Sequence, residues 1–196
     1  MQEYFKEKDL LYFTYPKGKR LFVNQEICEG AMCLMSGKIR VFSTSCNHKE
    51  ITLFTLESGD FCVLSASCVL PSFELDITLE VQEKCQIALL PTQKVKALCE
   101  ENPRFALKIN EIINKRLSQT LQVLSSVAFT PLHQRIKDFL LQSHQEVLYI
   151  THEELANHLG TAREVITRAL KDMRQKGEIE LQRGKIIIKN LQTPPK

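Results

Sequence analysis

One segment in the C-terminal third of the chain decides the fold: residues 151–170, which read THEELANHLGTAREVITRAL. Thr151 followed three residues later by Glu154 is a capping box, which marks the start of a helix. Gly160 allows the sharp turn that ends this helix, and Thr161 is expected to cap a second one. Two short helices joined by a tight turn predict a helix-turn-helix, whose second helix enters the major groove of DNA.

The apolar residues of this segment predict the buried sides of the two helices. The first helix is expected to bury Leu155, Ala156 and Leu159, and the second Val165, Ile166, Ala169 and Leu170. The side chains then left for DNA are Arg163, Glu164, Thr167 and Arg168, with Lys171 as a phosphate contact and Thr151 and Thr161 at the helix starts. Arg can bind guanine through two hydrogen bonds, and Glu can accept one from cytosine.

The residues on either side of this segment complete a small domain. Residues 178–181 and 185–189 flank the turn Gln182-Arg183-Gly184 and predict a β-hairpin, the wing. Upstream, Thr130-Pro131 starts a helix from Leu132 to about Gln145, and residues 147–150 predict a short strand. The ordered set indicates a winged helix-turn-helix. The alternative is a small α/β interaction module with a basic face.

A long helix is expected before this domain. Asn102 is a good cap and Pro103 a good first residue, and neither Gly nor Pro follows before Phe129. Such a helix is about 40 Å long at ~1.5 Å per residue. Its apolar stripe consists of Ile109, Ile113, Leu117, Leu121, Leu124 and Val127. The stripe predicts either a coiled-coil-like seam with a second copy or packing on its own domain.

Residues 17–91 predict short strands broken by turns. The expected strands are 20–23, 38–42, 51–56, 75–81 and 86–90, and Thr92 is expected to cap a short helix that reaches Cys99. Many short strands favour a sandwich, barrel or roll. We therefore expect an α+β chain with a β-domain in residues 1–102, a dimerisation helix in residues 103–129 and a DNA-binding domain in residues 130–196.

Composition narrows the class of protein. The net charge is +3, and the excess lies after residue 130, where eleven Lys and Arg face eight Asp and Glu. A mildly basic C-terminal region is suited to binding nucleic acid. No apolar run reaches the ~18 residues of a membrane span, and the N-terminus has no apolar signal region, so we expect a cytoplasmic protein. Neither a Cys-x-x-Cys motif nor a phosphate loop nor a nucleophile elbow occurs, which argues against an enzyme.

With these motifs, the chain resembles the CRP/FNR superfamily of transcription regulators over about residues 15–190, most closely in residues 160–168. The resemblance implies an antiparallel β-roll of the cyclic-nucleotide-binding (cupin-like) type, a dimerisation helix and a winged-helix domain. It places Arg163, Glu164 and Arg168 at base-contacting positions. It also implies a homodimer on double-stranded DNA, inverted repeats with half-sites related to TGTGA, and RNA polymerase as a partner.

The effector region departs from the cyclic-nucleotide pattern. No Arg occurs between Arg40 and Arg104, so the partner that clamps a cyclic phosphate is missing, and cyclic AMP is not expected. Residues 49–68 resemble the carbon-monoxide-sensing CooA members of the family, but their haem-ligand positions fall on Val63 and Ser65. The resemblance therefore supplies no haem ligands at those positions, and the cofactor is left open among haem, an iron–sulfur cluster and zinc.

Seven cysteines, all before residue 100, leave the sensing chemistry open. An odd count in a chain without a signal argues against a disulfide framework. Cys28 with Cys33, and Cys62 with Cys68, could hold an iron–sulfur cluster or zinc, or form a redox pair. Cysteine is also a common buried apolar residue. The alternative to a regulator is a thiol-based or metal-binding cytoplasmic protein without sequence-specific DNA binding.

Overall fold

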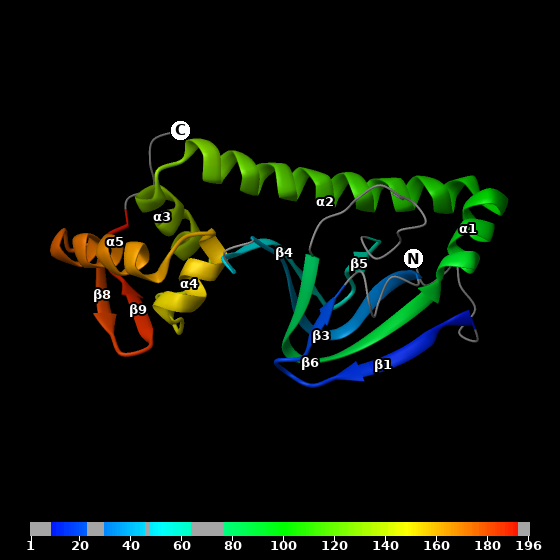
Figure 1. Cartoon of the computed structure of the whole chain (residues 1–196), viewed down its shortest axis with the longest axis horizontal. Helices are drawn as coiled ribbons and strands as arrows, with labels where there is room; N and C mark the ends of the chain where they lie inside the picture. Colours follow the sequence, from blue (N-terminus) through cyan, green and yellow to red (C-terminus); the bar gives the residue numbers. More distant parts are fainter. Residues whose placement is uncertain (1–8, 23–29, 46–47, 64–76, 192–196) are drawn as a thin grey trace. The chain divides into compact units, whose positions relative to one another are not determined.

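The computed structural model describes residues 9–22, 30–45, 48–63 and 77–191. The chain divides into two compact units (Figure 1). The first comprises Met1–Thr44 and Leu53–Leu121, and the second Ser45–Thr52 and Gln122–Lys196. Among the described residues, no helix is long and apolar enough to cross a membrane. The α+β class predicted from the sequence is confirmed, whereas the domain limits expected above stay a prediction.

The N-terminal unit is built on an antiparallel sheet. Its strands are β1 (Leu11–Tyr15), β2 (Arg20–Phe22), β3 (Gly30–Thr44), β4 (Glu50–Glu57), β5 (Phe61–Cys62) and β6 (Ile77–Pro91). The central order is β1-β6-β3-β4, with β2 beside β6 and β5 beside β3. The long β3–β6 pair runs from Gly30 opposite Pro91 to Ser43 opposite Ile77. This pair is the frame to which the other strands attach.

Two strands expected separately, 75–81 and 86–90, are one strand, β6, in the described residues. The turn expected between them is a bulge, because the β3–β6 register shifts between Leu34 and Ile39. Gly37 lies at the shift with φ +91°, and a Cβ atom there would lie 2.5 Å from the Lys84 carbonyl oxygen. Only glycine fits such a position, so the strand bends here without ending.

The inner face of the sheet is packed with apolar side chains from β2 to β6, among them Leu34, Ile39, Leu56, Leu79 and Ile87. A second cluster joins the sheet to two helices, α1 (Thr92–Glu101) and α2 (Pro103–Phe129). Asn102 caps α2 as predicted, because its Oδ1 accepts from the N–H groups of Arg104 (3.0 Å) and Phe105 (3.3 Å). The cap predicted at Thr92 is wrong, since Pro91 keeps the extended ψ of 144° and Thr92 is already helical.

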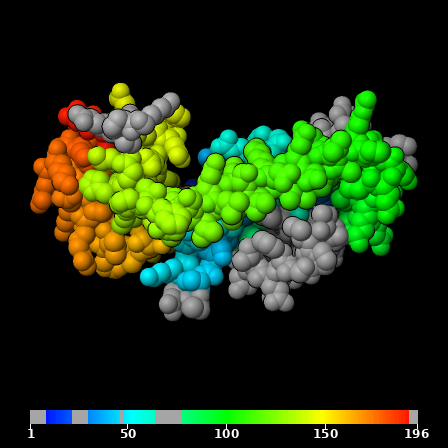
Figure 2. All heavy atoms as spheres, turned by 90° about the horizontal axis from the view of Figure 1, so that it is seen from above, coloured from blue at the N-terminus to red at the C-terminus, as the bar shows by residue number. Residues whose placement is uncertain are grey.

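The apolar stripe of α2 is divided between two environments. Ile109 is 3% exposed and packs with Phe105 against the sheet, and Ile113 packs on the same cluster. The prediction that Ile109 belongs to the seam is therefore wrong, because the sheet of the same chain covers this side chain. Leu117, Leu121, Leu124 and Val127 are 51%, 53%, 62% and 40% exposed. On the face shown in Figure 2 this helix is uncovered.

The C-terminal unit packs three helices with a small sheet. Its elements are α3 (Leu132–Gln142), β7 (Val147–Leu148), α4 (His152–Leu159), α5 (Arg163–Gln175), β8 (Ile179–Gln182) and β9 (Lys185–Ile188). The strand order is β7-β9-β8, and β8 and β9 form the predicted hairpin. Their shared core includes Ile136, Leu155, Ile166, Leu170 and Ile186. The helix expected to reach Gln145 ends at Gln142.

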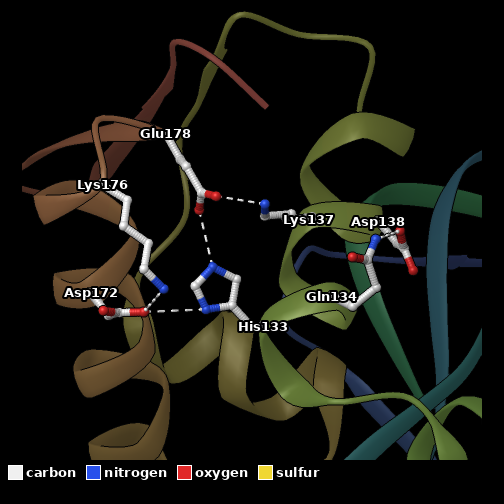
Figure 3. A network of polar contacts seen from close by, with 7 residues as sticks. All are labelled: His133, Gln134, Lys137, Asp138, Asp172, Lys176 and Glu178. Carbon is white, nitrogen blue, oxygen red and sulfur yellow. Dashed lines mark hydrogen bonds and ion pairs between the residues drawn. The ribbon is translucent and has the colours of Figure 1, made fainter. Parts of the chain in front are cut away.

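A polar network fastens α3 to α5 and β8 (Figure 3). Glu178 accepts from Lys137 Nζ at 2.5 Å, and its second oxygen lies 3.0 Å from His133 Nε2. On the other side of the ring, His133 Nδ1 lies 3.5 Å from Asp172, which also pairs with Lys176 at 2.7 Å. Glu178 directly precedes β8, so the network holds the wing's first strand against the helices.

Candidate nucleic-acid interface

The start of α4 has the predicted capping box. Thr151 Oγ1 accepts from the Glu154 N–H at 3.1 Å, and the Glu154 carboxylate accepts from the Thr151 N–H at 2.7 Å. At the other end, Gly160 adopts the left-handed conformation with φ 64°, which lets its N–H donate to Ala156 O. Both features were expected from the sequence, and together they fix where α5 begins.

The cap of α5 differs from the prediction. Ala162, with φ −88° and ψ 146°, is the N-cap, and no side-chain bond caps this helix. Thr161 is part of the turn instead, since its N–H donates to Ala156 O at 3.0 Å. The prediction that Thr161 caps α5 is wrong by one residue, because the turn after Gly160 uses one residue more than expected.

The outward face of α5 presents the predicted polar side chains. Arg163, Glu164, Arg168 and Lys171 are exposed, and Thr167 is half-buried. Ile166, Leu170 and Met173 face the core. The prediction that Val165 is buried is wrong, since this side chain is 42% exposed. Successive residues of a helix point about 100° apart, and Ile166 is the one that points into the core. The accessible face therefore carries cations, a carboxylate and one apolar group.

His152 belongs to this surface and was missed from the sequence. Its Nδ1 lies 2.9 Å from Thr167 Oγ1, and Thr167 Oγ1 donates to the Arg163 carbonyl at 2.8 Å. A cleft of about 350 Å³ beside it is lined from α4, α5 and the wing. No sequence signal marks His152, because its partner lies on another helix and the cleft exists only after the wing folds back.

On the effector side, an ion pair that the sequence did not predict involves the buried Arg116. Arg116 of α2 is only 3% exposed, and its Nη2 lies 3.2 Å from Asp60 Oδ1 and 3.2 Å from the Phe61 carbonyl oxygen. Its guanidinium also lies 4.8 Å from the centre of the Phe54 ring. Burial favours a higher pKa for Asp60, but the Glu57 N–H and the Arg116 and Lys115 charges outweigh it and lower the pKa. The turn at Gly59-Asp60 is thereby fastened to α2.

The candidate cysteines are placed in part. Cys33 and Cys62 are buried, at 6% and 1% exposure, on the neighbouring strands β3 and β5. Burial raises the pKa of Cys33, which keeps it in the unreactive thiol form. Cys28 and Cys68 lie outside the described residues. Within the described ranges, no group of three His, Cys, Asp or Glu side chains is arranged to hold a metal ion.

Comparison with known proteins places both halves of the chain. A model described as a Crp-like helix-turn-helix domain matches residues 134–193, and one described as a cyclic nucleotide-binding domain matches residues 12–102. The first match covers α4, α5 and the wing, so the surface described above lies within a known type of helix-turn-helix domain.

Whole-chain relatives agree. The chain is 32% identical to a transcriptional regulator of the Crp/Fnr family from Eubacterium rectale, with a TM-score of 0.84 over 93% of this chain and 87% of that one. It is 26% identical over 187 residues to the cyclic AMP receptor protein of Thermus thermophilus, covering 92% of this chain and 86% of that protein. The c-di-GMP responsive global regulator CLP of Xanthomonas campestris shares the fold, with a TM-score of 0.80 and 20% identity over 93% and 95% of the two chains.

Proposed function

The chain belongs to the CRP/FNR family of DNA-binding transcription regulators, and on this premise we propose that it binds inverted-repeat promoter sites as a homodimer. The observation that carries the proposal is the outward face of α5. Arg163, Glu164 and Arg168 are exposed together on a helix whose other side is fixed in the core. Family members of this kind are regulators and not enzymes.

Each residue of the interface has a chemical task in this proposal. Arg163 and Arg168 donate to guanine, and Glu164 accepts from cytosine N4. Val165 offers methyl groups that suit the thymine C5-methyl group. Thr161 and Lys171 contact the sugar-phosphate backbone, which positions the helix without selecting sequence. Thr151 and Thr167 donate their hydroxyl protons to Glu154 and to the Arg163 carbonyl, and so hold this surface in place.

The homodimer is proposed from the exposed half of α2. Leu117, Leu121, Leu124 and Val127 recur at spacings of four, three and three residues, and an exposed apolar row of this kind marks an interaction site. A two-fold dimer then presents two α5 helices to half-sites about one helical turn apart. Half-sites related to TGTGA are what the family resemblance of residues 163, 164 and 168 implies.

The effector is proposed to act in the N-terminal unit and not to be cyclic AMP. Two of the relatives described above are named for different nucleotides, cyclic AMP and c-di-GMP, so their names do not identify the effector of this chain. The described roll contributes no phosphate-clamping Arg, and Arg116 is already paired with Asp60. A redox or metal signal through Cys62 or Cys68 remains our candidate. We further propose that the dimer acts in the cytoplasm and contacts RNA polymerase.

The test of the DNA interface is the Arg168→Ala variant. Binding to a duplex with TGTGA-type half-sites is expected to weaken by about 1–3 kcal/mol, while binding to random duplex changes little. Lys171→Ala is expected to weaken both equally and to reduce the salt dependence. Fluorescence anisotropy at fixed salt measures each affinity.

Arg174→Ala is the matched control, because Arg174 is also exposed but lies in the last turn of α5. It is expected to bind like wild type. Equal losses on specific and random duplex for Arg168→Ala would refute the base contact. An absence of salt-dependent duplex binding by the wild type would refute the function itself.

A further inference from the structure

The cleft beside α5 combines groups from three elements of the C-terminal unit. Its volume is about 350 Å³. The charged and titratable residues that line it are His152 and Glu153 of α4, Arg163 of α5 and Lys185 of the wing. With a neutral His152, two cations face one carboxylate, so the cleft carries a net positive charge. It also opens beside the base-contacting face of α5, where the DNA backbone passes in the proposed complex.

The hydrogen bonds of Thr167 determine the tautomer of His152. Thr167 has one hydroxyl proton, which it donates to the Arg163 carbonyl at 2.8 Å. The hydroxyl oxygen therefore accepts from His152, so Nδ1 carries the proton in the 2.9 Å contact. Nε2 of the neutral ring then has a lone pair and no hydrogen. It can donate to an anion only after the ring takes up a second proton.

We propose that this cleft binds one phosphate group of duplex DNA, and that His152 takes up a proton to donate from Nε2 to that phosphate. The inference rests on the proposed DNA-binding function and adds that the protein takes up a proton when it binds DNA. Arg163 and Lys185 supply the fixed positive charge that attracts the phosphate. His152 supplies a charge that appears on binding.

The charges around His152 set the direction of the pH dependence. Burial lowers the pKa of His152, and the Arg163 and Lys171 charges lower it further. Lys185 and Glu153 also line the cleft, with one positive and one negative charge. The ring of the free protein is therefore mostly neutral near neutral pH. A bound phosphate favours the protonated ring, so its pKa is higher in the complex than in the free protein. Between these two values, DNA affinity falls as the pH rises.

The experiment measures the affinity of the full-length protein for an inverted-repeat duplex between about pH 5.5 and about pH 8, at constant ionic strength. For wild type, the association constant is expected to rise by up to about tenfold for each unit by which the pH falls, for each proton taken up. His152→Asn keeps an amide donor for Thr167 but does not titrate, and it is expected to lose this slope. His152→Arg carries its charge throughout and is expected to bind tightly at the upper end of the range.

The matched control is His144→Asn. His144 is exposed in the same unit, and its left-handed backbone (φ 52°) suits asparagine. This variant is expected to keep the wild-type slope, and thermal unfolding checks that all variants fold. A flat wild-type profile, or an unchanged slope in His152→Asn, overturns this inference and leaves DNA binding intact. If no duplex binding occurs at any pH, both this inference and the proposed function fail.

Discussion

The charged side chains of the C-terminal unit lie in two kinds of surroundings, open solvent or a network of polar partners. Arg163 and Arg168 extend from α5 toward solvent, where a partner can reach them. Glu178 instead lies between Lys137 and His133, and its side chain is 16% exposed. A carboxylate so enclosed is stabilised by its donors and contributes to stability, because removing it leaves those donors without an acceptor.

At this scale we expect Glu178→Gln to lower the free energy of unfolding at neutral pH by about 1–3 kcal/mol. Burial raises the pKa of Glu178, but the hydrogen bonds from Lys137 and His133 outweigh it, and the pKa lies below its usual value. The carboxylate's contribution is therefore complete above the pKa of an unfolded Glu, and it is lost as the pH falls through the folded value.

Urea unfolding of wild type and variant at neutral and acid pH measures this difference. The two proteins should differ at neutral pH and converge in acid. Glu146→Gln, a change at an exposed position of the same unit, should leave stability unchanged. A difference that persists undiminished in acid would show that packing, and not the carboxylate charge, is responsible.

Among the elements, α2 serves two roles along its length. Its first turns pack Phe105 and Ile109 against the sheet, and Arg116 fixes it to the Gly59-Asp60 turn. The remaining turns expose leucines at helical spacing. A single continuous helix can thus be anchored in one unit and still offer an apolar row to a second copy.

We expect Leu121→Asp to give monomers, because a dimer would have to bury an unpaired carboxylate in its apolar seam. Sedimentation velocity at micromolar concentration is the measurement, and specific DNA binding should weaken in parallel. Gln122→Asp adds the same charge one residue away, off the apolar row, and should remain dimeric. A monomeric wild type under these conditions would contradict the seam.

For the whole molecule, the open question is what switches DNA binding. A ligand can shift the balance between two states only if it binds them unequally. The ion pair of Arg116 and Asp60 joins the turn next to the candidate effector segment to α2, and α2 carries the proposed dimer seam. A change at Cys62, which directly follows Phe61, can therefore reach α2 through the contact between Phe61 and Arg116.

We expect cyclic AMP to leave DNA affinity unchanged, since the described roll contributes no phosphate-clamping Arg. We expect oxidant or metal removal to change it in wild type and not in Cys62→Ala or Cys68→Ala. Cys85→Ala is the control, because Cys85 is as buried as Cys62 but lies on β6, outside the candidate segment. The experiment measures DNA affinity with and without each treatment, and it also measures the metal content of protein purified without oxygen. Wild-type behaviour of both variants, with no bound metal, would make these cysteines packing residues.

The sequence by itself determined the features that depend on neighbours a few residues away. The capping box of Thr151 and Glu154, the left-handed turn at Gly160, the Asn102 cap and the β8–β9 hairpin are all local. Each is settled by backbone hydrogen bonds and torsions within a short stretch of chain. For the same reason the polar face of α5 was predictable, including Arg163, Glu164 and Arg168.

The tertiary structure alone decided what depends on residues distant in the chain. Gly30–Leu34 is buried on both faces, so it lacks the alternation that marks a strand and was missed. Ile109 lost its place in the seam because the sheet covers it, and Val165 became exposed because Ile166 took the core position. His152 with Thr167, and Arg116 with Asp60, meet only after folding. Burial and pairing at these positions are properties of the packed chain, and no local pattern encodes them.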